Sequence, residues 1–138
     1  MAVLTPDQLA NLPDPVLRSL AYTGLLNADI PTSVTLTQTG RIKSDPKRGW
    51  MTFTAEETYS LDPPGFTWAA KVRSRGMNML KVTDRLEDGK GRMRGRLLGL
   101  VTLFNESGPH VDQGSLVRWL NETMWFPWVW ATGPVTWE

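Results

Sequence analysis

Most of the chain alternates apolar and polar residues with a period of two, which is typical of β-strands that bury one face. Between residues 32 and 103 the alternating runs are separated by turn-forming segments, among them Asp45-Pro-Lys-Arg-Gly49, Asp62-Pro-Pro-Gly65 and Glu87-Asp-Gly-Lys90. Short turns join strands that run in opposite directions. We therefore expect an antiparallel meander of about six strands, with one apolar face and one face of threonine, lysine and arginine.

Two segments outside the meander have apolar residues three and four positions apart, the spacing of an amphipathic helix. Residues 13–26 predict a first helix, and residues 113–125 predict a second helix that Pro127 ends. We expect residues 105–111 to form a loop and residues 129–138 to form another strand. The predicted fold class is α+β: an N-terminal helix, a curved antiparallel meander resembling a half-barrel, and a second helix packed on the apolar face of the sheet.

Length and composition indicate one ordinary globular domain over residues 1–138, with 41% hydrophobic and 21% charged residues. The chain has no cysteine and one histidine, which excludes disulfide scaffolds, Cys/His zinc sites and thiol nucleophiles, so we assign no metal and no cofactor. The first residues lack a secretory signal, and the most apolar stretch, residues 123–131, is far shorter than the roughly 20 residues of a membrane-spanning helix. We expect a soluble, cytoplasmic protein without a transmembrane segment.

The net charge of +1 conceals an uneven distribution along the chain. Residues 41–96 hold 13 Lys and Arg against 7 Asp and Glu, whereas the segments on either side are acidic. The alternation places the basic strand residues on the polar face of the sheet. This face is either simply solvated or a surface for nucleic acid or anionic lipid headgroups. It lacks aromatic residues that stack on bases, so we expect no specific nucleic-acid binding.

Three polar residues fall on strand faces that are otherwise apolar: Gln38, Glu57 and Asp84. A buried carboxylate is costly unless it is paired or hydrogen-bonded. These residues could contact a ligand in a cavity, form a carboxylate pair for acid–base chemistry, or be satisfied by a buried arginine or by the backbone. A strand register shifted by one residue would instead place them on the outer face. On the second helix, Glu122 lies one turn after Arg118 and can pair with it. Glu122 is therefore either part of a surface salt bridge with Arg118 or a polar site residue.

Five of the seven tryptophans lie between Trp119 and Trp137. They could fill the space between helix and sheet as core side chains, form a lid over an apolar ligand, or anchor the protein at a membrane interface. The sequence leaves these three alternatives open.

Several longer segments carry a resemblance that spans nearly the whole chain: Leu12-Pro-Asp-Pro-Val-Leu-Arg-Ser-Leu20, Trp50-Met-Thr-Phe-Thr-Ala-Glu56, Pro63-Pro-Gly-Phe-Thr-Trp68, Val82-Thr-Asp-Arg-Leu-Glu-Asp-Gly-Lys-Gly-Arg-Met93 and Asp112-Gln-Gly-Ser-Leu-Val-Arg-Trp-Leu-Asn-Glu-Thr-Met-Trp-Phe-Pro127. On these segments the chain resembles an uncharacterised, mainly bacterial family of unknown function. The resemblance implies no activity. It does imply further strands after Val135-Thr-Trp137, so we expect a sheet that is incomplete relative to the family pattern. The order of elements is also similar to that of lipoprotein carriers with a half-barrel fold.

The leading hypothesis for function is a non-enzymatic protein that binds a hydrophobic or amphipathic small molecule between sheet and helix. The expected ligand-binding residues are the apolar walls Phe53, Tyr59, Phe66, Trp68, Trp119 and Trp125, with Glu57, Asp84 and Glu122 as polar contacts. An alternative is a structural or interaction module whose open sheet edge pairs with a partner chain or with a second copy of itself. A hydrolase that uses the inward carboxylates is a third hypothesis, for which we assign no catalytic residue.

Overall fold

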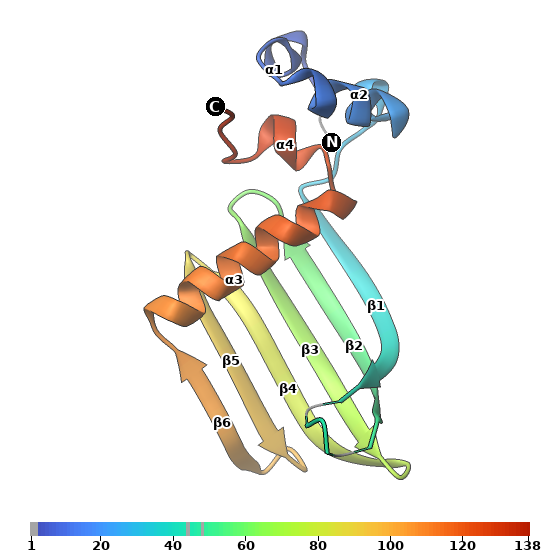
Figure 1. The fold of residues 1–138 in the computed structure, drawn as a ribbon, viewed down its shortest axis with the longest axis vertical. Helices are drawn as coiled ribbons and strands as arrows, with labels where there is room; N and C mark the ends of the chain where they lie inside the picture. Colours follow the sequence, from blue (N-terminus) through green and yellow to red (C-terminus); the bar gives the residue numbers. More distant parts are fainter. Residues whose placement is uncertain (1–2, 44, 48) are drawn as a thin grey trace.

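The computed structural model describes residues 3–43, 45–47 and 49–138, and it confirms the α+β class (Figure 1). Six antiparallel strands form one open sheet in the order of the sequence, as the alternation predicts. A long helix, α3 (Pro109–Glu122), packs across this sheet. The strands are β1 (Ser33–Ile42), β2 (Met51–Ser60), β3 (Gly65–Ser74), β4 (Met77–Glu87), β5 (Lys90–Leu97) and β6 (Val101–Ser107).

The pairing register assigns every strand residue to one of two faces, because residues directly opposite each other in antiparallel strands share a face. On the apolar face Tyr59 lies opposite Phe66, which in turn lies opposite Leu86. On the polar face Thr67 lies opposite Arg85, and Arg85 opposite Arg92. We call these the apolar face and the polar face of the sheet.

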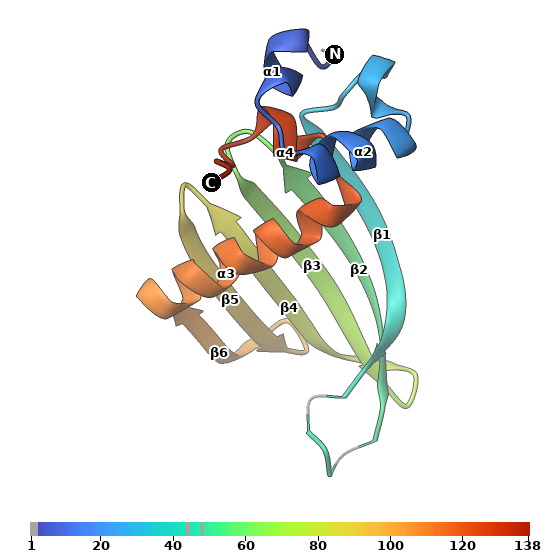
Figure 2. The ribbon, with the colours of Figure 1, turned by 45° about the horizontal axis from the view of Figure 1, so that its top comes forward.

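Helix α3 crosses the apolar face near one end of the strands (Figure 2). The side chains buried beneath it form the larger core, which contains Tyr59, Leu61, Phe66, Leu86, Trp119, Phe126 and Val129. Close approach of α3 to β5 depends on Gly91, where a Cβ atom would lie 2.5 Å from the carbonyl oxygen of Val111. A backbone oxygen cannot move aside easily, so this position requires glycine.

A smaller helical layer lies beyond the same end of the sheet, where the C-terminus is also found (Figure 1). It holds the second core, made of Leu4, Val16, Leu20 and Ile30, against which Trp128 and Trp130 pack. The elements of this layer are α1 (Pro6–Ala10), α2 (Asp14–Tyr22), the 3₁₀ turn η1 (Leu25–Asn27) and α4 (Val129–Thr132). No helix in the described part of the chain is long and apolar enough to cross a membrane.

Three expectations about local structure were wrong. The strand expected over 129–138 is absent, and Val129–Thr132 forms a helical turn because Trp128 and Val129 pack into the cores. The loop expected over 105–111 is replaced by the end of β6 and the start of α3. The first helix ends at Tyr22, four residues earlier than expected. Of the turn expected over residues 45–49, residue 48 lies outside the described residues.

Candidate functional site

The two inward carboxylates lie in one row across the apolar face of the sheet. Glu57 on β2 is opposite Trp68 on β3, and Trp68 is opposite Asp84 on β4. Both carboxylates are buried, with Glu57 only 1% exposed. The alternation of the strands therefore places two ionisable groups beneath α3, on either side of a tryptophan.

Arg118 of α3 connects these carboxylates. Its Nη2 donates to Glu57 Oε1 at 2.7 Å, and its Nη1 donates to Asp84 Oδ2 at 2.7 Å. Its Nε donates to Glu122 Oε1 at 2.9 Å, the pair expected one turn apart. The guanidinium carbon also lies 4.4 Å from the ring centroid of Phe66. Of the alternatives left open by the sequence, the inward carboxylates are thus satisfied by an arginine. We call Arg118, Glu57, Asp84 and Glu122 the arginine cluster.

Gln38 on β1 extends the arginine cluster toward the edge of the sheet. Its Nε2 donates to Glu57 Oε2 at 2.9 Å, and its Oε1 accepts a hydrogen bond of 2.8 Å from Trp68 Nε1. Both oxygens of Glu57 therefore have a hydrogen-bond donor, and the indole of Trp68 is held in a fixed orientation. A connected polar network of this kind is compatible with burial because each charged group in it is paired.

Burial and neighbouring charges shift the pKa values in the arginine cluster. Burial and the nearby charge of Glu122 raise the pKa of Glu57, although Arg118 acts in the opposite direction. Burial alone would lower the pKa of Arg118, but the hydrogen bond and charge of Glu122 and the charge of Glu57 raise it, so it stays charged. Burial also raises the pKa of Tyr59, whose hydroxyl donates to the carbonyl of Trp119. The arginine cluster therefore contains one permanent positive charge, on Arg118, and three carboxyl groups.

The raised pKa of Glu57 predicts a specific pH dependence of stability. At a pH above 4.5, the ordinary pKa of a glutamate, Glu57 is protonated to a greater extent in the native protein than in the unfolded chain. The contribution of Glu57 to the free energy of unfolding therefore falls as the pH rises through the native pKa of Glu57. In Glu57→Gln this loss is absent. We expect the free energy of unfolding of Glu57→Gln, measured by urea titration relative to wild type, to increase from mildly acidic to neutral pH.

Glu56→Gln is the matched control for this pH dependence, because Glu56 is the neighbouring residue on the exposed polar face. Its free energy of unfolding relative to wild type is expected to stay constant over the same pH range. If the free energy of unfolding of Glu57→Gln relative to wild type also stays constant with pH, Glu57 titrates in the native protein as it does in the unfolded chain.

A cleft of about 450 Å³ extends from the arginine cluster along the uncovered part of the apolar face. The pairing register shows the order of the wall residues along the cleft. Trp68 lies beside the arginine cluster, and the next row holds Val82, opposite Ala70. Val72 and Leu80, opposite each other, form the row after that, and Ile42 and Met51 form the last row. The full lining is Gln38, Ile42, Met51, Trp68, Val72, Leu80, Val82, Met93, Phe104, Arg118, Glu122 and Trp125. This cleft is apolar along its length and polar at the end formed by the arginine cluster.

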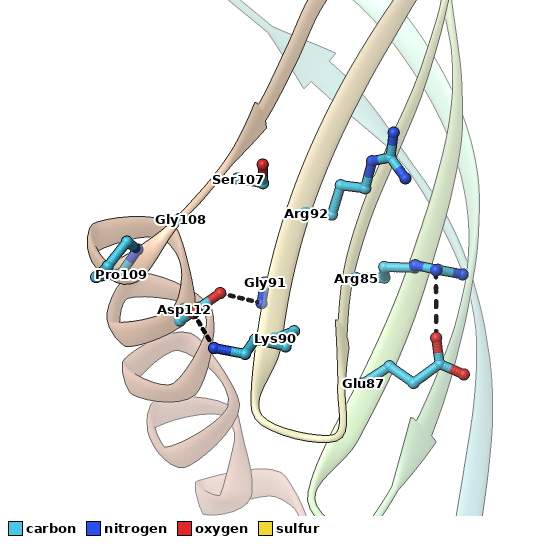
Figure 3. A pocket seen from close by; sticks show the side chains of 9 residues that line it. All are labelled: Arg85, Glu87, Lys90, Gly91, Arg92, Ser107, Gly108, Pro109 and Asp112. Carbon is cyan, nitrogen blue, oxygen red and sulfur yellow. Dashed lines mark hydrogen bonds and ion pairs between the residues drawn. The ribbon is translucent and has the colours of Figure 1, made fainter.

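Other hollows are more polar or smaller than this cleft. The hollow of about 590 Å³ in Figure 3 lies between β5 and the start of α3. Its charged side chains have polar partners: Lys90 Nζ lies 3.0 Å from Asp112 Oδ2, Arg85 pairs with Glu87 at 3.2 Å, and Arg92 Nε donates to Asn105 Oδ1 at 2.9 Å. A hydrogen bond from the backbone N–H of Gly91 is the main cause of the lowered pKa of Asp112. The two contacts of Asp112 hold β5 against α3, and the wall of this hollow is more polar than apolar.

The structure brings three of the nine expected ligand-binding residues to the cleft. Trp68, Glu122 and Trp125 line the cleft, whereas Tyr59, Phe66 and Trp119 lie in the core under α3. Phe53 is half-buried and packs on Trp68, with ring centroids 5.9 Å apart. Glu57 and Asp84 are ion-paired with Arg118 and are not among the residues that line the cleft.

Sequence reasoning did not include Arg118 and the strand residues Met51, Val72, Leu80 and Val82 among the site residues. The signal for Arg118 was present: an arginine on the helix that covers two inward carboxylates is their natural counterion. The described residues contain no group of three or more His, Cys, Asp or Glu that could hold a metal ion.

Comparison with known proteins supplies a family but no activity. Residues 2–138 match the sequence profile of DUF6544, which is described as a family of unknown function. No curated protein and no solved structure matches the chain.

Proposed function

The chain belongs to DUF6544, and we propose that this protein binds a hydrophobic or amphipathic small molecule in the cleft on the apolar face of its sheet. The observation that carries the proposal is the 450 Å³ cleft, apolar along its walls and closed at one end by the arginine cluster. Ligand sites of small molecules have volumes of about 300–1,000 Å³, mainly apolar walls and a few placed polar groups.

Electrostatics at the closed end restrict which head group can bind there. Arg118 already donates to three carboxylates, and its side chain is only 28% exposed. An anionic head group would have to approach Glu122 and the other carboxylates with little free positive charge to attract it. We therefore favour a neutral or cationic head group near Glu122, with the apolar part of the ligand along Val82, Leu80 and Met51.

Filling the middle of the cleft tests this proposal. Val82 lies in the wall of the cleft, and Thr83 is its neighbour on the exposed polar face. Val82→Trp is expected to weaken binding of the neutral apolar dye Nile red at least tenfold, a loss of about 1.4 kcal/mol, because the indole occupies the ligand's space. Thr83→Trp adds the same side chain outside the cleft and is expected to bind the dye like wild type.

The measurement is the equilibrium dissociation constant from dye emission, with urea unfolding of each variant to establish that it is folded. Equal dissociation constants for wild type and the two variants would contradict the proposed site. Leu80→Trp, at the next row of the same wall, provides a second variant if Val82→Trp does not fold.

The alternative of an interaction module also has an observation in its favour. Strand β6 forms one edge of the sheet, and its side chains Val101 and Leu103 are exposed. Edges of this kind can pair with another chain. If the edge pairs with a second copy of the chain, the protein forms a dimer or larger assembly at micromolar concentration, whereas ligand binding in the cleft requires only a monomer. Sedimentation equilibrium separates the two.

A further inference from the structure

Three connections between strands meet at the end of the sheet that lies away from the helical layer (Figure 1). They join β1 to β2, β3 to β4, and β5 to β6. In an antiparallel meander every second connection returns to the same end, so these three lie beside one another. We call their described residues, together with the strand ends next to them and Lys81 of β4, whose side chain reaches the β5–β6 connection, the rim.

Each connection of the rim exposes at least one large apolar side chain. Trp50 lies before β2, Met77 begins β4, and Leu98 and Leu100 lie between β5 and β6. These four side chains are between 61% and 78% exposed. Single exposed apolar residues are common on protein surfaces, but a group of them on neighbouring turn tips usually marks an interaction site.

Basic residues surround these apolar tips. Lys43 lies in the first connection, and the guanidinium carbon of Arg41, just before it, is 5.9 Å from the ring centroid of Trp50. Arg75 lies in the second connection, and Arg73 lies just before it on β3. On β4, the Lys81 side chain reaches the glycine between Leu98 and Leu100. The described rim contains a single carboxylate, Asp45. Much of the positive excess of residues 41–96 is therefore gathered at one end of the molecule.

We propose that the rim docks on an anionic lipid bilayer. Tryptophan and leucine side chains partition into the headgroup and upper acyl region, and lysine and arginine interact with lipid phosphates. Each basic residue near an anionic surface contributes a factor of about five to the partition coefficient. The rim combines both kinds of side chain on the same three turns.

Docking by the rim brings the ligand cleft to the bilayer surface. The last wall residues of the cleft, Ile42 and Met51, are the strand residues that border the β1–β2 connection. A lipid-like molecule could thus pass between bilayer and cleft without crossing water. The docking proposal does not depend on the proposed function, because it rests on the rim alone.

Nucleic acid fits the rim less well than a bilayer does. Phosphates would attract the basic residues but leave the four apolar tips in water. The tips also spread across a six-stranded sheet, about 24 Å wide at a strand spacing of about 4.8 Å, whereas the major groove of DNA is about 12 Å wide.

Vesicle co-sedimentation of the full chain tests the proposal, with phosphatidylcholine vesicles that contain or lack phosphatidylglycerol. Wild type is expected to bind only the anionic vesicles, and more weakly at high salt. The double variant Arg75→Glu/Lys81→Glu is expected to reduce the partition coefficient by a factor of about 25 or more, because each of the two lost basic residues contributes a factor of about five. The double variant Arg18→Glu/Arg92→Glu makes the same change in net charge away from the rim. It is expected to reduce the partition coefficient less than about fivefold.

The apolar tips are tested separately. Leu98→Ser with Leu100→Ser is expected to weaken vesicle binding at least tenfold, whereas Tyr22→Ser with Leu116→Ser, two exposed apolar residues outside the rim, leaves binding unchanged. These positions are exposed, so the variants should fold, and urea unfolding verifies it.

Three results would overturn the proposal: no binding to anionic vesicles at low salt, equal loss of vesicle binding in the rim and control variants, or rim-dependent binding of duplex DNA without vesicle binding. Nile red binding without vesicles remains a separate measure of the cleft.

Discussion

Replacing Arg118 by methionine is expected to lower the free energy of unfolding by about 3–5 kcal/mol, the cost of leaving a buried charge without its partner. Arg118 donates to Glu57 and Asp84, and both carboxylates are buried under α3. Without the guanidinium they repel each other and Glu122 in a region that water reaches poorly. Domains of this size are stable by about 5–15 kcal/mol, so the loss is large enough to measure by urea unfolding.

Two further variants identify the cause of that loss. Arg85→Met breaks an ion pair with Glu87 whose side chains are largely exposed, and it is expected to cost no more than about 1 kcal/mol. Adding Glu57→Gln and Asp84→Asn to Arg118→Met removes the unpaired charges and is expected to restore part of the stability. Equal costs for Arg118→Met and Arg85→Met would show that the arginine cluster is not a buried ion network.

Replacing Trp119 by alanine is expected to cost about 3–5 kcal/mol, as is usual for a large buried aromatic side chain. Trp119 is 2% exposed and stacks on Tyr59, with ring centroids 6.3 Å apart. Its Nε1 also donates to the carbonyl of Ser60 at 3.0 Å, so the substitution leaves that oxygen without its donor. Since α3 carries Arg118, loosening this contact should also disturb the arginine cluster.

Trp125→Ala is the matched control, because Trp125 lies just after α3 and is 60% exposed. It is expected to change the free energy of unfolding by less than about 1 kcal/mol but to weaken Nile red binding, since Trp125 lines the cleft. Trp119 is thus assigned to the fold and Trp125 to the ligand. Urea unfolding and dye titration of both variants check the assignment, and a larger loss of stability for Trp125→Ala would contradict it.

The meander and its two faces could be predicted because a strict period of two leaves little choice of face. Once Phe66 and Trp68 point inward, Thr67 must point outward, and a turn such as Glu87-Asp-Gly-Lys90 fixes where the strands reverse. The same logic placed Glu57 and Asp84 on the apolar face. Local pattern and turn chemistry were sufficient for these features.

The helix boundaries and the centre of the site depend on contacts that are distant in sequence. Val129 has β-branched, strand-like character, yet packing of Trp128 and Val129 into the two cores makes a helical turn there. Arg118 was recognised only as a partner for Glu122. Its contacts with Glu57 and Asp84 follow from the angle at which α3 crosses the sheet, and the sequence does not specify that angle.

Native mass spectrometry of gently purified protein tests the central claim, binding of a lipid-like molecule in the cleft, most directly. We predict a monomer that carries an additional mass of lipid size, retained by Thr83→Trp and lost in Val82→Trp. A ligand-free dimer or larger assembly, or an additional mass that persists unchanged in Val82→Trp, would contradict the account.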